Sequence, residues 1–415
     1  MVNHAFTWVF LAALALATGA RLWLALRQAR HVRMHRAAVP ESFAGAIPLA
    51  AHQKAADYTV AKVRLGMIDA ILDALVLLAL TLGGLLQLFI EQWSRLLPAG
   101  SLWHGAALIV TVLVLRSALE LPASLYRIFV IEERFGFNKM TLKLFVTDLL
   151  KSTAVMAALG IPLLLAVLWL MAAAGGYWWL YVWAVLVAYT MILQMIVPAL
   201  VMPIFNKFSP LEDPALVERV QRLLARCGFR SRGLFVMDGS KRSAHGNAYF
   251  TGFGATKRIV LFDTLINRLQ PGEVEAVLAH ELGHFKLRHI VKGMLLSWTV
   301  SFIMLFILGL LVGQPWFYAG LGVQTNTLAV ALLLFLMVVP EFMFFLKPAT
   351  SLFSRKNEFE ADGYAAKYSN AEDLINALVK LYRDNATTLT PDPLHSVFYD
   401  SHPPAATRIA RLKAA

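Results

Sequence analysis

The stretch Ala279-His280-Glu281-Leu282-Gly283-His284 contains an H-E-x-x-H motif. Pro271 and the acidic residues after it are typical of a helix start, so the motif is predicted to lie on a helix. Residues four apart share one helix face, and His280 and His284 can therefore hold one metal ion. Glu281 places a carboxylate beside them, as in zinc peptidases. Ordinary core or surface histidines are the alternative, and a third ligand would decide between the two.

The residues after the motif narrow the class of metal site. A metzincin extends the motif to H-E-x-x-H-x-x-G-x-x-H, but Leu287 and Ile290 stand at the required glycine and histidine. His289 is one residue out of register, and we interpret it as an interfacial basic residue. The remaining possibility is a glutamate from a separate helix, as in His2Glu zinc sites.

The segment 354–365 offers that glutamate. Glu358 and Asp362 are four residues apart and share a helix face, whereas Glu360 points elsewhere. We expect Glu358 to be the third ligand and Asp362 to accept a hydrogen bond that fixes the tautomer of one histidine. Glu360 is the next ligand candidate, and an exposed acidic helix turn is the alternative for the pair.

The composition is that of a membrane protein. Of 415 residues, 58% are hydrophobic and only 15% are charged, whereas soluble domains carry roughly 25% charged residues. The net charge of +12 comes from basic residues between apolar segments, which suits lipid headgroups and excludes a nucleic-acid partner. The single cysteine, Cys227, excludes an internal disulfide and is expected in the core.

Seven apolar stretches are long enough to cross a hydrocarbon core of about 30 Å as helices. They are residues 5–26, 66–90, 103–125, 149–173, 177–201, 291–313 and 326–347. No positively charged region precedes the first stretch, which we therefore expect to be an uncleaved membrane helix rather than a signal peptide. Residues 27–65 are predicted to be a basic loop.

Lysine and arginine counts predict the orientation. The segments after the first and third helices are rich in both, whereas those after the second, fourth and sixth contain only Arg95. By the positive-inside rule the rich side is cytoplasmic. Residues 202–290 and the tail from 348 are then cytoplasmic, and the hairpin of the sixth and seventh helices can bring His284 and Glu358 together.

This division predicts four regions and a small α/β catalytic fold. The regions are 1–201 (five membrane helices), 202–290 (catalytic), 291–347 (two membrane helices) and 348–415 (catalytic). Residues 214–227 show a helical pattern, and 234–237 and 258–262 are predicted strands. Between them, 243–254 is typical of an exposed edge strand that could pair with an extended substrate; an ordinary hairpin strand is the alternative.

The last candidate region is Ser401-His402-Pro403-Pro404, followed by a short basic helix with Arg408. His402 could stabilise an oxyanion, and Arg408 could hold the substrate backbone or its terminal carboxylate. Both could equally be tail residues without a role in catalysis.

Together these motifs resemble the type I CAAX prenyl endopeptidases, integral-membrane zinc metalloproteases of the gluzincin type. The resemblance rests on five groups of residues in the same order along the chain: 131–139, 243–254 with 257–266, 280–284, 354–362, and 401–404 with Arg408. It implies a polytopic all-α membrane protein with seven transmembrane helices around a large chamber. A small α/β gluzincin-type zinc metalloprotease domain lies on the cytoplasmic side.

The resemblance also implies roles for individual residues. One Zn²⁺ per chain is held by His280, His284 and Glu358, and Glu281 and His402 are catalytic. The expected substrate-binding residues are Asn247, Ala248, Tyr249, Phe250 and Arg408. Substrates are peptides or proteins, isoprenylated or membrane-associated ones included, and CAAX proteins lose their last three residues.

The short loop between the last two membrane helices and the short tail differ from the longer eukaryotic members. The Ala/Leu/Arg-rich composition suggests a bacterial member in the inner membrane, or one in the endoplasmic reticulum if the source is eukaryotic. Two alternatives remain open: a broad-specificity quality-control zinc protease of the membrane, and a non-enzymatic membrane protein.

Overall fold

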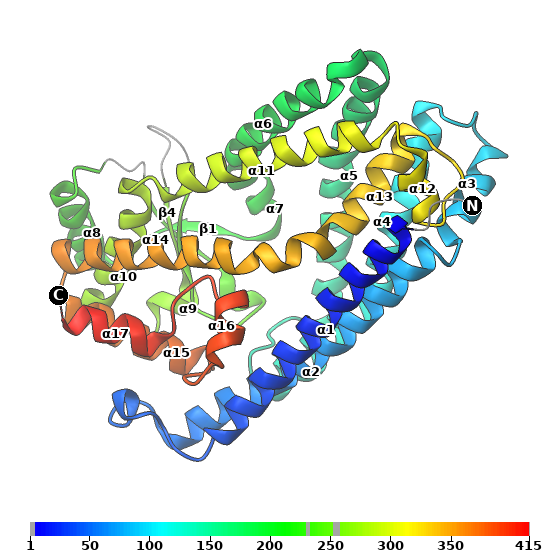
Figure 1. Cartoon of the computed structure of the whole chain (residues 1–415). Coiled ribbons are helices and arrows are strands. Elements are labelled where there is room, and N and C mark those ends of the chain that lie inside the picture. Colours follow the sequence, from blue (N-terminus) through cyan, green and yellow to red (C-terminus); the bar gives the residue numbers. More distant parts are fainter. Residues whose placement is uncertain (1–4, 230–232, 252–257, 415) are drawn as a thin grey trace.

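The computed structural model describes residues 5–229, 233–251 and 258–414. Figure 1 shows long helices on one side of the molecule and a smaller protease part, with a sheet among shorter helices, on the other. The protease part is formed mainly by the second half of the chain. The long helix α14 runs from the membrane helices into it.

Within the described residues, six helical spans are long and apolar enough to cross a membrane, and a bent helix pair adds a seventh if it is counted as one span. This agrees with the seven predicted spans. In chain order the helices that form them are α1 (Ala5–Met34), the pair α2 (Leu49–Leu80) and α3 (Leu85–Ser94), α4 (Leu102–Tyr126), α5 (Leu142–Ala173), α6 (Trp178–Ile196), α11 (His289–Leu311) and α13 (Leu328–Met343). Short π-helical segments, Arg127–Glu132 and Val197–Val201, follow α4 and α6.

The prediction of a loop over 27–65 is wrong. Helix α1 continues to Met34 and α2 starts at Leu49, so most of this stretch is helical. The two helices pack along each other (Figure 1), and Arg36 pairs with Asp57 across them at 2.8 Å. Hydropathy marks only the part of a helix that lies in hydrocarbon, so charged helical extensions beyond it resemble loops.

The seventh span continues into the helix that carries Glu358. Between α13 and α14 (Lys347–Tyr368) there is only a single 3-10 turn, Phe344–Leu346. Within its most apolar window, 61% of this span is buried, against 0–22% for the other five single spans. Helix α13 is therefore the central helix of the membrane part, and its extension into the protease part is fixed by that packing.

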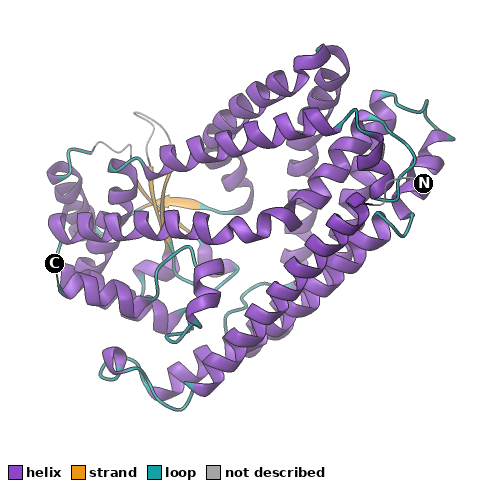
Figure 2. Ribbon diagram, in the orientation of Figure 1, coloured by secondary structure: helices purple, strands orange, loops and turns teal. Residues whose placement is uncertain are grey.

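Among the described residues, the protease part contains a four-stranded sheet in the order β1-β2-β4-β3. Figure 2 shows the strands enclosed by helices. The strands are β1 (Phe208–Pro210), β2 (Leu234–Met237), β3 (Ala248–Thr251) and β4 (Arg258–Phe262). Strands β2 and β4 are parallel, whereas β1 and β3 are antiparallel to their neighbours. The strands expected at 234–237 and 258–262 are present, and β3 lies at one edge of the sheet. Part of the predicted 243–254 strand lies outside the described residues.

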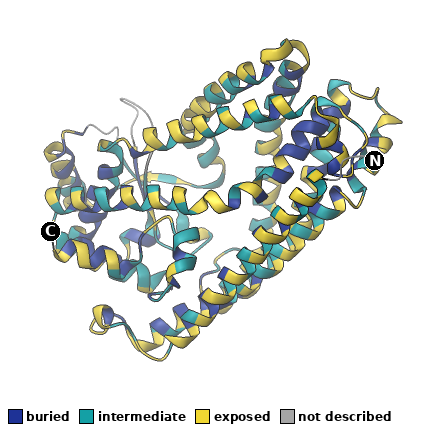
Figure 3. Cartoon of the chain, viewed as in Figure 1, coloured by how far each residue is buried: buried dark blue, intermediate teal, exposed yellow. Residues whose placement is uncertain are grey.

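Most of the remaining helices lie around this sheet. They are α7 (Met202–Phe205), α8 (Pro214–Arg226), α9 (Asp263–Ile266), α10 (Pro271–Lys286), α15 (Ala371–Asp384), α16 (Pro393–Tyr399) and α17 (Ala405–Lys413). Helix α12 (Pro315–Gly320) instead lies in the α11–α13 connection and packs against α1 in the membrane part. The buried side chains of the protease part form one hydrophobic cluster with Val220, Leu278 and Leu378 among its members. Figure 3 shows this buried interior and the exposed outer faces of the long helices.

The segment after α4 ties the membrane part to the start of β3. Asn138 and Ser243 form an antiparallel bridge, and the Ala244 amide donates to the Phe137 carbonyl at 3.1 Å. The Phe137 ring stacks on His245 at a centroid distance of 4.4 Å. These contacts fix the approach of the chain to the edge strand.

Candidate metal centre and active site

Helix α10 lies in the interior of the protease part and carries two of the candidate ligands. It begins with Pro271 in its first turn, and the Gln270 amide donates to Glu273 Oε2 at 2.7 Å. This pairing satisfies one of the free amides of a helix start. The two buried carboxylates of α10 are neutralised by ion pairs, Glu273 with Lys380 and Glu275 with both Arg219 and Arg226. The helix can therefore be buried without leaving unpaired charges.

Gly283, inside the motif, allows α14 to approach α10 closely. A Cβ atom at this position would lie 3.0 Å from the Ala361 Cα and 3.1 Å from the Tyr364 Cβ. Backbone cannot retreat as a flexible side chain can, so only glycine fits without separating the helices. This contact sets the distance between the histidines on α10 and Glu358 on α14.

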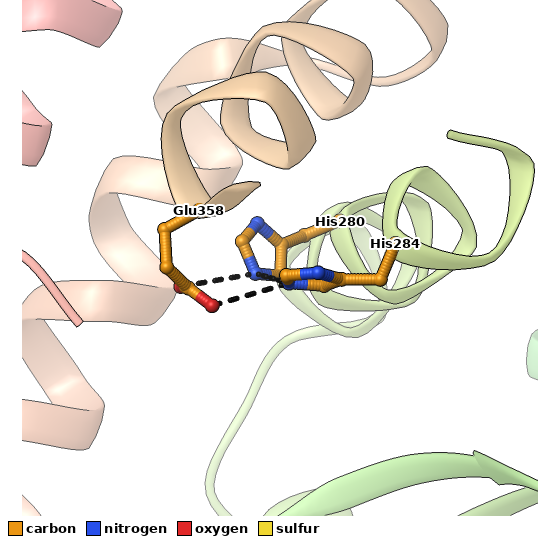
Figure 4. A group of neighbouring side chains, drawn as sticks. All are labelled: His280, His284 and Glu358. Carbon is orange, nitrogen blue, oxygen red and sulfur yellow. Dashed lines mark hydrogen bonds and ion pairs between the residues drawn. The ribbon is translucent and has the colours of Figure 1, made fainter. Parts of the chain in front are cut away.

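Three side chains from these two helices converge (Figure 4). His280 and His284 point their Nε2 atoms at each other, 3.1 Å apart. Glu358 faces both rings, with Oε2 3.6 Å from His280 Nε2 and Oε1 3.2 Å from His284 Nε2. The three donors lie within 4.8 Å of one another, and all three side chains are at least partly buried.

This spacing fits a tetrahedral metal ion. Ligands about 2.0–2.2 Å from an ion in tetrahedral geometry lie about 3.3–3.6 Å apart, and the three measured separations are 3.1, 3.2 and 3.6 Å. The buried Glu358 Oε2 has no hydrogen-bond partner among the described residues. Two imidazoles and a carboxylate are also a donor set that zinc accepts.

Behind His280, a buried pair fixes the ring. His280 Nδ1 lies 2.9 Å from Asp362 Oδ1, so that its N–H donates to the carboxylate and leaves Nε2 free for a metal. Arg408 binds both Asp362 oxygens, at 2.6 and 2.8 Å, and its Nη1 lies 3.5 Å from Glu358. Arg408 is only 5% exposed. Its guanidinium therefore contacts the candidate ligand Glu358 and the supporting carboxylate of Asp362, and Arg408 also lines the cavity beside them.

Glu281 and His402 face a cavity beside the three donors. Burial raises the pKa of the Glu281 carboxyl, which favours its exchanging a proton near neutral pH. The His402 side chain is 61% exposed because it faces this cavity, and its Nε2 lies 3.4 Å from Glu358 Oε1. Desolvation by the surrounding atoms lowers the pKa of His402, so its ring is neutral at pH 7 and can donate one N–H.

The cavity has a volume of about 450 Å³ and is bordered by the start of the edge strand. Asn247 and Ala248 line it, next to Gly246. The Tyr249 hydroxyl instead lies 3.3 Å from the Met202 sulfur, and Tyr249 is not among the residues that line this cavity. The side chain of Phe250 lies outside the described part of the chain. Of the five residues expected at the substrate, three therefore line the cavity: Asn247, Ala248 and Arg408.

Two family models together match residues 28–415. The first describes the N-terminal part of CAAX prenyl proteases, with five membrane helices, and matches residues 28–207. The second describes peptidase family M48 and matches residues 210–415. The chain belongs to peptidase family M48. It is a multi-pass membrane metalloendopeptidase, and the alternative of a non-enzymatic membrane protein is set aside.

Relatives of this M48 peptidase are similar over most of their length. The CAAX prenyl protease 1 homolog of Arabidopsis thaliana is 33% identical over 394 residues, which cover 93% of this chain and 92% of the relative. CAAX prenyl protease 1 of Saccharomyces cerevisiae is 37% identical over 314 residues, which cover 72% of this chain and 69% of the relative. The crystal structure of S. mikatae Ste24p superposes with a TM-score of 0.89 at 30% identity, covering 98% of both chains.

Two residues at the M48 site were not expected there from the sequence. Tyr382 lines the cavity, and burial raises the pKa of its hydroxyl to about 12, so it remains a donor. His289 is not the interfacial residue expected: it is 5% exposed, and its Nδ1 lies 3.0 Å from His284 Nδ1. The helical periodicity of α10 gives no sign of this contact, because α10 ends before His289.

Proposed function

We propose that this chain is a zinc endopeptidase that cleaves isoprenylated proteins ending in CAAX and removes their last three residues. The observation that carries the proposal is the set of three donors at tetrahedral spacing beside Glu281, in a cavity bordered by an edge strand. The substrate class is supported by the similarity to relatives named CAAX prenyl protease 1. One zinc ion per chain suits the three donors.

The catalytic roles follow from the positions of the side chains. Zinc held by His280, His284 and Glu358 would supply a Lewis acid for the scissile carbonyl and for the attacking water. Glu281 takes the proton of that water and delivers it to the leaving amine. Its raised pKa brings both transfers within reach near neutral pH.

Charge that develops on the carbonyl oxygen is met by His402. Its neutral ring donates an N–H from the cavity wall, which is the role of an oxyanion donor. Arg408 stabilises the ligand set through Asp362 and Glu358. We therefore propose that Arg408, which also lines the cavity, acts mainly by supporting the ligands.

The substrate is proposed to lie extended along β3. This strand forms an edge of the sheet, and Asn247 and Ala248 lead from it into the cavity. Backbone hydrogen bonds to an edge strand bind a peptide with little dependence on its side chains. Such binding also suits the alternative of a broad-specificity quality-control protease, which the substrate experiment below addresses.

We place the protease part on the cytoplasmic side of the membrane, from the basic segments after the first and third spans. A bacterial inner membrane is the proposed location, as the composition suggests. The proposed regions are 1–201, 202–290, 291–347 and 348–415.

The test compares two matched peptides, one farnesylated with a C-terminal CAAX sequence and one unmodified. Each is incubated with the detergent-purified protein, with and without a chelator, and with Glu281→Gln. We expect the farnesylated peptide to be cleaved preferentially, and cleavage to be lost with the chelator. Glu281→Gln should bind zinc with unchanged stoichiometry and lose at least about 10²-fold in kcat, the range for a general base.

Each result bears on a different part of the proposal. Equal cleavage of both peptides, with both controls inactive, would support the quality-control alternative and overturn the substrate class. Full activity of Glu281→Gln would remove Glu281 from the mechanism. Cleavage that resists the chelator would contradict the metal-dependent mechanism.

A further inference from the structure

The side of His284 that faces away from the donors contacts a second histidine. His284 Nδ1 lies 3.0 Å from His289 Nδ1, and His289 Nε2 lies 3.0 Å from Glu360 Oε2. The three side chains form a row from the candidate metal site to the surface of α14. We propose that His289 and Glu360 fix the tautomer and orientation of His284 and thereby raise the metal affinity of the site.

The hydrogen bonds allow one arrangement of protons when both rings are neutral. An ionised Glu360 can only accept, so His289 Nε2 must carry a proton and donate it. Nδ1 of the neutral His289 is then an acceptor, and His284 Nδ1 must be the donor. His284 Nε2 is left with its lone pair, facing His280 Nε2 and Glu358 Oε1 at 3.1 and 3.2 Å. The row therefore leaves the Nε2 atom of His284 unprotonated, which is the form that binds a metal ion.

Glu360 is held in place for this role. Lys292 on α11 lies 3.7 Å from one carboxylate oxygen, and Lys356 on α14 lies 3.9 Å from the other. The Glu360 side chain is 34% exposed, whereas His289 is buried. The lysines favour the ionised carboxylate, which is the acceptor that the row requires.

The backbone between α10 and α11 brings His289 to this position. Arg288 has φ 58° and ψ 32°, in the left-handed region that non-glycine residues rarely adopt. Arg288 separates α10 from α11 and changes the direction of the chain. His289, the first residue of α11, therefore contacts His284 in the last turn of α10. A membrane-spanning helix is thereby connected directly to a candidate ligand.

The row parallels the support of the other histidine. Asp362 accepts from His280 Nδ1 directly, whereas Glu360 acts on His284 Nδ1 through an intervening imidazole. Each histidine then has a carboxylate behind it, and both carboxylates come from α14. Loss of such outer hydrogen bonds typically lowers metal affinity by about 10–100-fold.

The inference rests on the proposed metal centre, and its test therefore measures metal binding without a substrate. Purified His289→Phe, His289→Asn and Glu360→Leu are titrated with a chelator of known affinity, and the zinc retained is measured. The Asn side-chain oxygen can take the place of the His289 Nδ1 acceptor, whereas Phe cannot. The exposed His35, whose ring contacts the His31 carbonyl on α1, provides the matched control His35→Asn.

We expect His289→Phe to lower zinc affinity by about 10–100-fold, and His289→Asn to restore much of the loss. Glu360→Leu should weaken affinity less, because His289 can still accept from His284. The visible spectrum of the cobalt-substituted protein should change in His289→Phe and remain as in the unsubstituted protein in His35→Asn. A merely structural role of His289 would not produce this dependence on one acceptor atom.

Equal zinc affinity in His289→Phe and the unsubstituted protein would overturn the inference, and so would equal losses in the Phe and Asn variants with unchanged cobalt spectra. An unsubstituted protein that binds no zinc would instead overturn the metal centre, and the inference with it. Failure of the CAAX substrate alone would leave these affinities unchanged, so the two failures can be told apart. Thermal unfolding of each variant identifies any that fail to fold.

Discussion

At the residue scale, His402 offers a test of catalysis that is separate from metal binding. Its imidazole faces the cavity and contacts Glu358 Oε1 at 3.4 Å, but the three ligand donors are complete without it. We expect His402→Ala to lower kcat by about 10²–10³-fold, the usual loss for one oxyanion donor, with a smaller change in KM. Steady-state kinetics measures this loss, and zinc content should remain one per chain. A variant with unchanged kcat would exclude His402 from stabilising the oxyanion.

Arg408 is expected to act mainly on stability and metal affinity. Its replacement by methionine leaves the buried Asp362 carboxylate without its bidentate partner, and loss of one member of a buried pair costs about 3–5 kcal/mol. Thermal unfolding in detergent should show a clearly lowered midpoint. The double variant Asp362→Asn, Arg408→Met removes both charges and should recover part of this stability. If Arg408→Met only raised KM at unchanged stability, the substrate role expected from the sequence would be favoured instead.

Only some of the residues at the candidate site could be predicted from the sequence. His280 and His284, like Glu358 and Asp362, could be identified from the sequence because helical spacing puts each pair on one face, and Glu281 could be identified from its place in the motif. The role of His289 could not be predicted, because it depends on the left-handed backbone conformation of Arg288, and no local sequence pattern indicates that conformation. The contacts of Arg408 with Asp362 and Glu358 depend on the packing of α17 against α14, so they could not be predicted from the spacing of residues in the sequence either.

At the element scale, the contact between α10 and α14 determines the geometry of the metal centre. Gly283→Ala would place a methyl group 3.0 Å from the Ala361 Cα, and overpacking of this kind costs about 1–3 kcal/mol. We expect the helices to separate, and zinc affinity to fall together with the unfolding midpoint. Chelator titration and thermal unfolding measure the two effects. Gly363→Ala is the matched control, since no atom lies within 4 Å of a Cβ there; equal effects in both variants would contradict the argument.

Helices and strands could be predicted from the sequence where one buried face produces a regular pattern of apolar residues. The strands at 234–237 and 258–262 and the helix from Pro214 follow their apolar periodicity. The helical extensions of α1 and α2 were missed because their polar ends lie beyond the hydrocarbon, where hydropathy carries no signal. The near-continuity of α13 and α14 was missed for the same reason, although it is what carries Glu358 from the membrane to α10.

At the scale of the whole molecule, the orientation in the membrane can be tested from the structure. The segment after the third span contains basic residues and contacts the protease part, because Asn138 bridges Ser243. The basic end of the helices and the protease part therefore lie on the same side, and the positive-inside rule predicts that this side is cytoplasmic. The connection between α11 and α13, which includes Asn326, should lie on the opposite side.

Single cysteines introduced into a Cys227→Ser background would measure this orientation. Ser209, in β1, is exposed on the protease part, and Asn326 is exposed in the connection before α13. Cys227 is buried, so its removal changes no surface. In inside-out membrane vesicles, a maleimide that cannot cross the bilayer should label Ser209→Cys and leave Asn326→Cys unmodified until detergent is added. The reverse pattern would place the protease part outside, and it would require substrates to reach the metal centre from the other side of the membrane.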